Sequence, residues 1–337
     1  MSSSTPLLLS GFADEAANQK TIDQQFSALA ALGMRYFSIR FIDAGNGVKN
    51  AMALDDAEIA LIKEKLTEYG LSVSSIGSPI GKTKLCDVDD GTSTGYTPFE
   101  TYLKEDVVRA CQLANTFDTK LIRGFSFYHP KGSDIDEHFA QAVDQVGQIA
   151  DVCNEHGLTY GLEVEANLVG QTGQLLAKMH EQIARDALVT IFDGGNLVMQ
   201  GFSQEEVYQQ YIAMKPGLGW IHIKDFKDPA GSDRVTHVDE ESIKHFVPAD
   251  IGQSGHAAIM KDFAQFLPTL HQRMLDRGVP GVFADMEPHV KGGGQFGGFS
   301  GPDGFGVALR AFCRVCDDAG IEYRLRDFSD IQADRGF

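Results

Sequence analysis

Apolar residues along the chain follow two patterns that alternate from end to end. Short apolar runs predict eight β-strands, at 7–11, 36–41, 72–77, 121–127, 159–165, 189–193, 219–225 and 281–287. Longer segments with helical spacing of their apolar residues predict helices at 21–32, 55–69, 99–115, 135–155, 174–185, 204–213, 261–275 and 302–319. Gly33, Gly70 and Gly157 each follow one of these helical segments, as is typical of helix ends.

Strict alternation of strands and helices predicts a parallel sheet in an α/β protein. At 337 residues, we expect this sheet to close into one (β/α)₈ TIM barrel, with residues 1–337 forming a single domain. A doubly wound open sheet is the alternative. It would favour a phosphate-binding glycine loop after an early strand, whereas the glycine-rich stretch 292–298 follows the last predicted strand. We interpret that stretch as a loop over the site.

Three predicted loops, at 81–98, 226–258 and 288–301, are longer than a barrel needs. All three follow strands, so they lie on the C-terminal face, where barrels place their active sites. Their length predicts a covered pocket.

The strand predicted at 219–225 has charged residues at alternate positions. His222 and Lys224 face one side, and Ile221 and Ile223 face the other. Such a strand packs poorly in an apolar interior, but it suits a polar centre inside the barrel.

Four consecutive predicted strands end in metal-ligating residue types, namely Glu165, Asp193, His222 and Glu287. The ends of parallel strands lie side by side around a barrel mouth. Three carboxylates and one imidazole suit one divalent ion, Mn²⁺, Mg²⁺, Co²⁺ or Zn²⁺. The sequence therefore predicts one shared metal site, although a polar residue at a single strand end is common without any ion.

The register of two of these strands is ambiguous. Glu163 and Glu165 are two residues apart and face the same side, and Asp285 and Glu287 repeat the situation. We favour Glu165 and Glu287 as ligands, because the barrel interior below the strand ends is normally packed with side chains. Glu163 and Asp285 would then support a ligand or a basic residue. The choice between Glu163 and Glu165 stays open.

Several motifs resemble those of the xylose-isomerase-like sugar phosphate isomerase/epimerase superfamily. The strand endings read GLEVEAN from Gly161, FDGGN from Phe192, HIKD from His222 and MEPH from Met286. Earlier segments resemble one bacterial branch of it, and read GFADE from Gly11, SIR from Ser38, SPIGK from Ser78 and IRGFSFY from Ile122.

The resemblance implies a single barrel with one divalent ion held by Glu, Asp, His and Glu. Members isomerise or epimerise sugars, dehydrate or cleave keto-sugars and cyclitols, or incise abasic DNA. Many epimerases of the superfamily have a His shortly after the strand-six Asp, where this chain has Gly194, Gly195 and Asn196. The nucleases are richer in His ligands, and the net charge of −18 would repel a nucleic-acid backbone.

We expect a metal-dependent sugar isomerase or epimerase that abstracts a proton next to a carbonyl, through an enediolate that the ion stabilises. Glu165 and Glu287 are the candidate acid/base pair, with Glu163 and His289 as alternative bases. Lys224 is a candidate donor to a substrate oxygen, or else the partner of a neighbouring carboxylate. A keto-sugar or cyclitol lyase with the same metal site is one alternative function, and a non-catalytic sugar-binding barrel is another.

Basic residues near other strand ends are candidates for substrate binding. Arg40, Arg123, Lys82 and His289 could contact sugar hydroxyls or an anionic group. Structural pairing of the two arginines with Asp14 or Glu15 is the alternative for them.

Composition adds little that is specific. The chain is 43% hydrophobic, which favours a large core, and we expect no nucleic-acid or membrane partner. The first residues lack the pattern of a signal peptide, so we expect a cytoplasmic protein. The pair Cys313 and Cys316 lies in a helix-like segment, where packing accounts for it better than redox or zinc chemistry. Barrels of this kind often pair, and a homodimer or homotetramer stays open.

Overall fold

A computed structural model describes residues 5–228, 245–290 and 301–336. Its main sheet contains eight parallel strands in the order β1-β12-β9-β8-β7-β6-β5-β2. The strands are β1 (Leu8–Gly11), β2 (Tyr36–Ile39), β5 (Ser72–Ile76), β6 (Leu121–Gly124), β7 (Thr159–Glu163), β8 (Leu188–Asp193), β9 (Leu218–Ile223) and β12 (Phe283–Met286).

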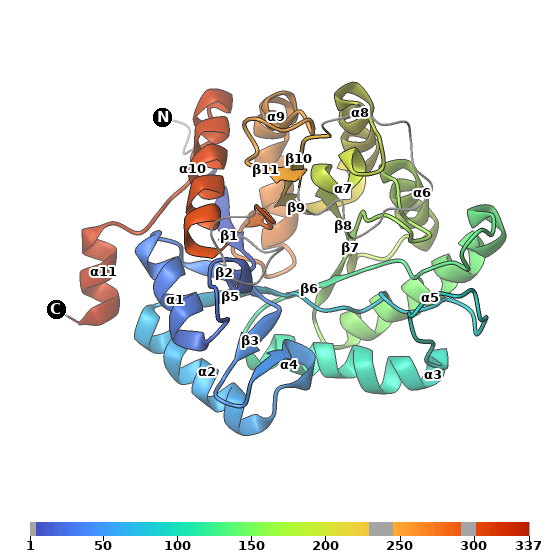
Figure 1. Cartoon of the computed structure of the whole chain (residues 1–337), viewed down its shortest axis with the longest axis horizontal. Helices are drawn as coiled ribbons and strands as arrows, with labels where there is room; N and C mark the ends of the chain where they lie inside the picture. Colours follow the sequence, from blue (N-terminus) through green and yellow to red (C-terminus); the bar gives the residue numbers. More distant parts are fainter. Residues whose placement is uncertain (1–4, 229–244, 291–300, 337) are drawn as a thin grey trace.

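The first and last strands of this order lie next to each other, so the sheet nearly closes. A single parallel bridge between Phe12 and Ser38 links the ends of β1 and β2. Helices ring the strands on the outside (Figure 1). They are α1 (Ile22–Ala31), α2 (Asp56–Tyr69), α3 (Phe99–Tyr102), α4 (Val108–Thr116), α5 (Ile135–Glu155), α6 (Gly173–Ile183), α8 (Gln204–Met214), α9 (His256–Leu275) and α10 (Gly301–Ala319). The predicted TIM barrel is confirmed.

Local chemistry explains where the helices begin and end. At the start of α2, the Asp55 side chain accepts from the backbone of Glu58, and the Glu58 side chain accepts from the backbone of Asp55. This reciprocal capping satisfies two backbone donors that no helical carbonyl reaches. Gly70 ends the same helix in the left-handed conformation, with φ of 63°, which costs glycine little.

Several elements were not anticipated from the sequence. A hairpin of β3 (Phe41–Asp43) and β4 (Val48–Asn50) follows β2, and β10 (Asp225–Phe226) pairs with β11 (Phe246–Val247) after β9. A π-helical turn, η3 (Leu103–Val107), joins α3 to α4. The remaining additions are the 3₁₀ turns η1 (Ala13–Glu15), η2 (Ala51–Ala53) and η4 (Lys215–Gly217), and the helices α7 (Gly194–Val198) and α11 (Phe328–Arg335).

Two of the predicted loops differ from the structure or lie partly outside it. α9 begins at His256, inside the loop predicted at 226–258. The glycine-rich stretch 292–298, interpreted as a loop over the site, lies outside the described residues. Cys313 and Cys316 lie in α10, as the helix prediction required, and Cys316 is buried.

Large aromatic side chains pack on both faces of the main sheet, where glycines on neighbouring strands leave room for them. Trp220 on β9 is fully buried, and a Cβ atom at Gly161 on β7 would lie only 2.2 Å from its ring. Tyr160 on β7 is equally buried, and a Cβ atom at Gly124 would lie 2.1 Å from its hydroxyl. This close packing makes a rigid base below the strand ends.

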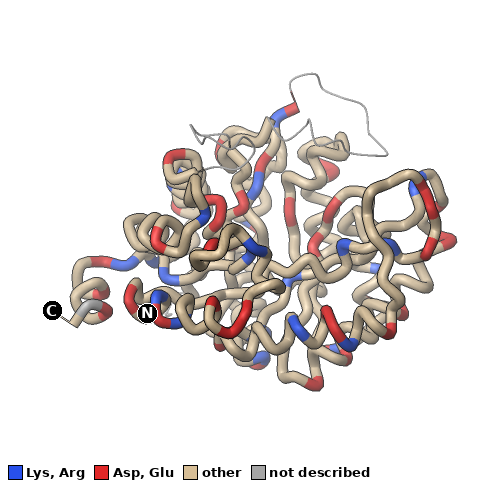
Figure 2. Tube along the Cα trace, turned by 60° about the horizontal axis from the view of Figure 1, so that its bottom comes forward, with Lys and Arg blue, Asp and Glu red and all other residues tan. Residues whose placement is uncertain are grey.

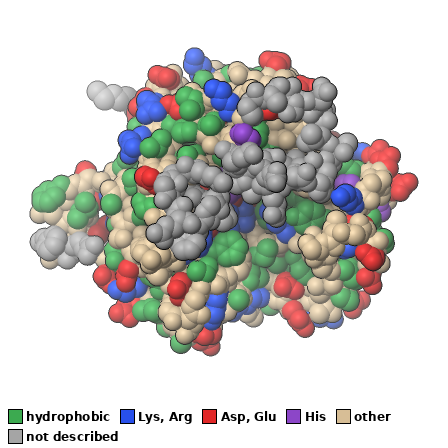
Figure 3. Space-filling view, in the orientation of Figure 1, with side chains coloured by type: hydrophobic (Ala, Val, Ile, Leu, Met, Phe, Trp, Pro, Cys, Tyr) green, Lys and Arg blue, Asp and Glu red, His purple; other side chains and the backbone are tan. Residues whose placement is uncertain are grey.

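The outer surface carries charges of both signs. Basic and acidic residues are interspersed along the chain trace (Figure 2). The face seen in Figure 3 is mixed in the same way, and hydrophobic side chains are exposed on the projecting α11. Among the described residues, no helix is long and apolar enough to cross a membrane.

We predict that Tyr160→Phe destabilises the mouth of the barrel. The Tyr160 hydroxyl accepts from the backbone N–H of Phe125 at 3.0 Å and contacts the carbonyl of Ile80 at 3.1 Å, so it ties the segments after β5 and β6 together. Its loss should lower the free energy of unfolding by about 1–2 kcal/mol, measured by urea denaturation. Tyr96→Phe, at an exposed tyrosine, should change it by less than about 0.5 kcal/mol; equal effects would contradict the prediction.

Candidate metal centre

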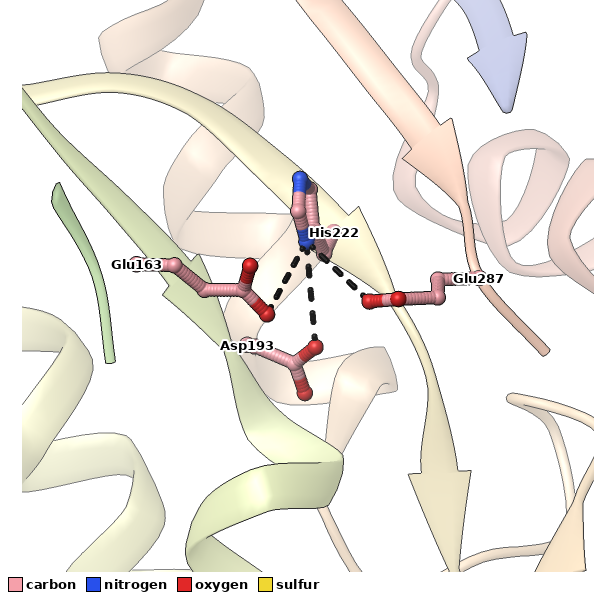
Figure 4. Close-up of side chains that lie close together, drawn as sticks. All are labelled: Glu163, Asp193, His222 and Glu287. Carbon is pink, nitrogen blue, oxygen red and sulfur yellow. Dashed lines mark ion pairs between the residues drawn. The ribbon is translucent and has the colours of Figure 1, made fainter. Parts of the chain in front are cut away.

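Four buried side chains from the second half of the barrel converge near the strand ends: Glu163, Asp193, His222 and Glu287. One ligand atom from each lies within 4.8 Å of the others. The Nδ1 atom of His222 lies 3.3 Å from Glu163 Oε1, 3.9 Å from Asp193 Oδ2 and 3.4 Å from Glu287 Oε2. Figure 4 shows Glu163 and Glu287 approaching this nitrogen from opposite sides.

Strand register explains this convergence. Asp193 and His222 are paired residues on the adjacent strands β8 and β9. Glu163 is the last residue of β7, and Glu287 directly follows β12, with its N–H donating to the carbonyl of Ile223 at 3.2 Å. Each of these side chains faces the barrel axis because alternate residues of a strand face the same side.

In each carboxylate of the cluster, one oxygen accepts a hydrogen bond from a neighbouring protein group, and the other oxygen faces His222. Glu163 Oε2 accepts from Arg123 at 3.2 Å, and Glu287 Oε1 accepts from Arg40 at 2.6 Å. Asp193 Oδ1 accepts from the backbone N–H of Asn196 at 3.0 Å, at the start of α7. The scaffold therefore orients three carboxylate oxygens towards one point.

The chemistry of these atoms fits a cation. His222 Nδ1 is buried and makes no hydrogen bond of normal geometry within the described residues, a costly state for a polar atom. Carboxylate oxygens and an imidazole nitrogen are ligands for divalent ions such as Mg²⁺, Mn²⁺ and Zn²⁺. Glu163, Asp193, His222 and Glu287 would hold such an ion.

The crowding of charges is visible in the pKa values. Burial alone would lower the pKa of His222, but the carboxylates of Glu163 and Glu287 outweigh it and raise the pKa to about 10. Burial alone would raise the pKa of Glu163, but His222 and Arg123 lower it to about 2. Burial raises the pKa of Asp193 to about 6, against the opposing effect of Lys224. Without an ion, a proton on His222 therefore adds positive charge between these carboxylates.

Lys224, predicted to act beside the metal, lies against the cluster. Its Nζ atom is 3.0 Å from Asp193 Oδ2 and 3.1 Å from Glu287 Oε2. Burial would lower the pKa of this ammonium, but Asp193 and Glu287 raise it instead. Lys224 is therefore charged and within reach of whatever binds at the cluster.

Glu165, which the sequence favoured as a ligand and base, lies outside the cluster, and Glu163 takes that place. Glu165 instead pairs with Lys82 at 2.8 Å, and its side chain is 25% exposed. The reason is the length of the strand: pairing of β7 ends at Glu163, so Glu165 lies two residues beyond the ladder, towards the rim. Lys82, predicted to bind substrate, shares this partly exposed position.

The predicted substrate-binding arginines are buried in ion pairs. Arg40 contacts Asp14 and Glu15 at 3.0 Å each, in addition to Glu287, and Arg123 contacts Glu163. The structural pairing considered as the alternative for Arg40 is therefore present. Both guanidinium groups stack on Phe12, at 4.3 Å and 4.8 Å from its ring centre.

His289 completes a second group of ligand-type residues with Glu15 and Glu287. Its Nδ1 lies 2.9 Å from Glu15 Oε1, and its Nε2 lies 3.9 Å from Glu287 Oε1. Arg40 donates to the same oxygens of Glu15 and Glu287. A guanidinium already serves as the cation of this group, so the first cluster is the better metal site.

Asn196 was not singled out from the sequence as a site residue. Its Nδ2 donates to Glu163 Oε1 at 3.2 Å and to the carbonyl of Val164 at 3.1 Å. The available signal was its position three residues after Asp193, where an acidic N-cap meets the first turn of a short helix.

The fold is a TIM barrel with a buried cluster of three carboxylates and one histidine near its strand ends, and comparison with known proteins identifies its family. The chain belongs to the xylose isomerase-like TIM barrel family, whose model matches residues 26–294. No curated protein matches the sequence significantly.

Solved structures of similar fold cover nearly the whole chain. A xylose isomerase-like TIM barrel protein from Mycobacterium smegmatis, in complex with magnesium, has a TM-score of 0.61 and 18% identity over 94% of this chain and 96% of that one. The IolI protein with a bound zinc atom has a TM-score of 0.62 and 12% identity over 93% and 99%. D-Psicose 3-epimerase with D-tagatose, from Clostridium cellulolyticum H10, has a TM-score of 0.59 and 14% identity over 93% and 99%.

We predict that Glu163→Gln, at the end of β7, and Glu165→Gln, two residues beyond it, have different effects on metal binding. Glu163 faces His222 Nδ1, whereas Glu165 pairs with Lys82 at the rim. Glu163→Gln should weaken Mn²⁺ or Zn²⁺ binding by at least about 100-fold, more than loss of a supporting residue usually costs. Glu165→Gln should leave it within about threefold. Chelator competition measures both affinities, and the reverse order would place the ligand at Glu165.

We also predict that metal binding releases a proton. The pKa of His222 is about 10 without an ion, so at neutral pH a metal must displace the proton from Nδ1. The apparent affinity should therefore rise about tenfold per pH unit between about pH 6.5 and 8.5, and rise more steeply below pH 6, where Asp193 also holds a proton. Calorimetry in buffers of different ionisation enthalpy should find about one proton released per ion at pH 7.5. Binding without proton release would contradict this.

Proposed function

We propose that this protein is a sugar isomerase or epimerase that depends on one divalent ion. The convergence of Glu163, Asp193, His222 and Glu287 at the barrel mouth carries the proposal. The similarity in fold to D-psicose 3-epimerase, solved with D-tagatose, supports a small sugar or keto-sugar as substrate. Magnesium and zinc in other similar structures support an ion of the Mg²⁺, Mn²⁺, Co²⁺ or Zn²⁺ group.

The reaction starts with removal of a proton from the carbon next to a carbonyl. A bound ion would act as a Lewis acid and stabilise the negative charge that develops on the substrate oxygens. Glu163 and Glu287 lie on opposite sides of His222 Nδ1, so one carboxylate could take the proton and the other return it. Return to the opposite face of the same carbon gives an epimer, and return to the former carbonyl carbon gives an isomer.

The basic side chains would bind and orient the sugar. Lys224 Nζ lies beside Asp193 and Glu287 and could donate to a substrate oxygen as charge develops there. Arg40 and Arg123 hold the outer oxygens of Glu287 and Glu163, and so act mainly by positioning the acid/base pair. Lys82 and Glu165 lie further out and could contact hydroxyls remote from the reacting carbons.

The test is incubation of the metal-loaded protein with ketohexoses and 3-keto glycosides in D₂O. We expect deuterium to enter a product of unchanged carbon skeleton, detected by proton NMR and mass spectrometry. Loss of water or of an alcohol from the substrate would instead establish a lyase. Binding of sugars without deuterium exchange would leave a sugar-binding barrel and exclude catalysis.

We predict that His222→Ala and Glu287→Gln abolish turnover while the barrel stays folded. Each change removes one ligand atom from the cluster, and we expect deuterium exchange to fall at least about 1000-fold, as when a group stabilising the transition-state charge is lost. Circular dichroism checks the fold, and Glu58→Gln, a buried capping residue on α2, is the control. Full activity after removal of the ion by a chelator would exclude the mechanism.

A further inference from the structure

His222 has an aspartate beside it on each neighbouring strand. In the strand register, it pairs with Asp193 on β8 and with Asp285 on β12. Asp193 Oδ2 lies 3.9 Å from Nδ1, on the side of Glu163 and Glu287, whereas Asp285 Oδ2 lies 3.9 Å from Nε2, on the opposite side of the ring. Because both aspartates are register partners of His222, the pairing of the strands places them beside it.

The side of the ring that faces Asp285 lies deep in the interior. Asp285 and His222 are at most 1% exposed, and His222 Nε2 and both Asp285 oxygens lack hydrogen bonds of normal geometry within the described residues. Ser10, the register partner of Asp285 on β1, bonds to Ser74 at 2.6 Å and also contacts the Asp285 carboxylate. A buried N–H without an acceptor costs about 1–3 kcal/mol, so Nε2 and Asp285 face each other as complementary groups.

The ring itself is restrained. Phe12 packs against His222 edge to face, with ring centres 5.3 Å apart. The 3.9 Å between Nε2 and Asp285 Oδ2 exceeds hydrogen-bond length, and a small rotation of the carboxylate, or one bridging water, closes it. The same ring cannot turn its Nε2 into the cluster without losing the contact with Asp285.

We propose that Asp285 is a positioning residue for the metal centre: its carboxylate accepts the Nε2–H of His222, directly or through one water, and so presents the bare Nδ1 lone pair to the ion. This role rests on the metal centre of the proposed function. Acceptors behind a ligating histidine fix its tautomer and increase its basicity, and their loss typically weakens metal binding about 10- to 100-fold. Asp285 itself does not belong to the four-residue cluster.

The experiment measures Zn²⁺ and Mn²⁺ affinity by chelator competition for wild-type protein, Asp285→Leu and Asp285→Asn. Asp285→Leu removes the acceptor, and we expect about 10- to 100-fold weaker binding. Asp285→Asn keeps one acceptor oxygen at nearly the same volume, so it should lose less. It also keeps the test usable if the leucine variant fails to fold.

Asp225→Asn is the matched control. Asp225 is also buried, and its Oδ2 atom lies 3.8 Å from Nε2 of His256. Neither Asp225 nor His256 belongs to the cluster. Its substitution should change the metal affinity by less than about threefold.

Stability alone does not separate the positioning role from a structural one. Removing Asp285 leaves the buried Nε2–H of His222 without its acceptor, so the melting temperature of the metal-free Asp285→Leu protein should fall in either case, and the metal affinity of the folded variant distinguishes the two roles. In the zinc-loaded protein labelled with ¹⁵N-histidine, the zinc-dependent Nε2–H proton of His222 should shift upfield in Asp285→Leu, because its acceptor is gone.

Each outcome decides between these roles. Equal metal affinity in wild type and Asp285→Leu, with an unchanged Nε2–H signal, would overturn the role of Asp285 and leave the metal centre intact. A lower melting temperature of the metal-free variant with unchanged affinity would assign Asp285 to stability alone. Wild-type protein that binds neither ion would overturn the metal centre itself, and this role with it.

Discussion

Neutralising buried negative charge is the constraint on which the rest of this site depends. Glu163, Asp193 and Glu287 are at most 3% exposed and converge on one point. Like charges this close repel strongly in a low-dielectric interior, and each also loses its hydration. The cluster is compatible with a folded barrel only because cations surround it: Arg123 at Glu163, Arg40 at Glu287, and Lys224 at both Asp193 and Glu287.

The parallel barrel supplies these partners from different parts of the sequence. Arg123 comes from β6 and Glu163 from the adjacent β7, whereas Arg40 follows β2 and reaches Glu287 after β12. The second pair spans the closure of the barrel, where β1 and β2 are joined by a single bridge. Charge neutralisation at the site therefore also ties together the two ends of the sheet, so site and fold share the same contacts.

The sequence predicted the features that depend on residues close together in the chain better than those that depend on contacts between distant segments. Strand and helix alternation is a local pattern, and it predicted the barrel and all eight of its strands. Side-chain periodicity placed Asp193, His222 and Glu287 at the mouth, but it could not separate Glu163 from Glu165, since both face the same side. That choice depends on where β7 stops pairing with β8, after Glu163. The pairing of Arg40 with Asp14 or Glu15 was considered from the sequence, but the contacts of Asn196 with Glu163 and of Arg40 with Glu287 join distant segments, which no local pattern encodes.

Because the two oxygens of each carboxylate have different partners, the site is prepared for binding a cation. Arg123, Arg40 and the Asn196 N–H each hold an oxygen that points away from the centre, so the inward oxygens are oriented before any ligand arrives. A cation entering such a site need not collect flexible side chains, and the ordering cost that normally reduces affinity has already been met during folding. Arg123 and Arg40 thus both neutralise the buried glutamates and preorganise them, which helps to explain why a polar cluster of this kind can persist at the centre of a tightly packed barrel.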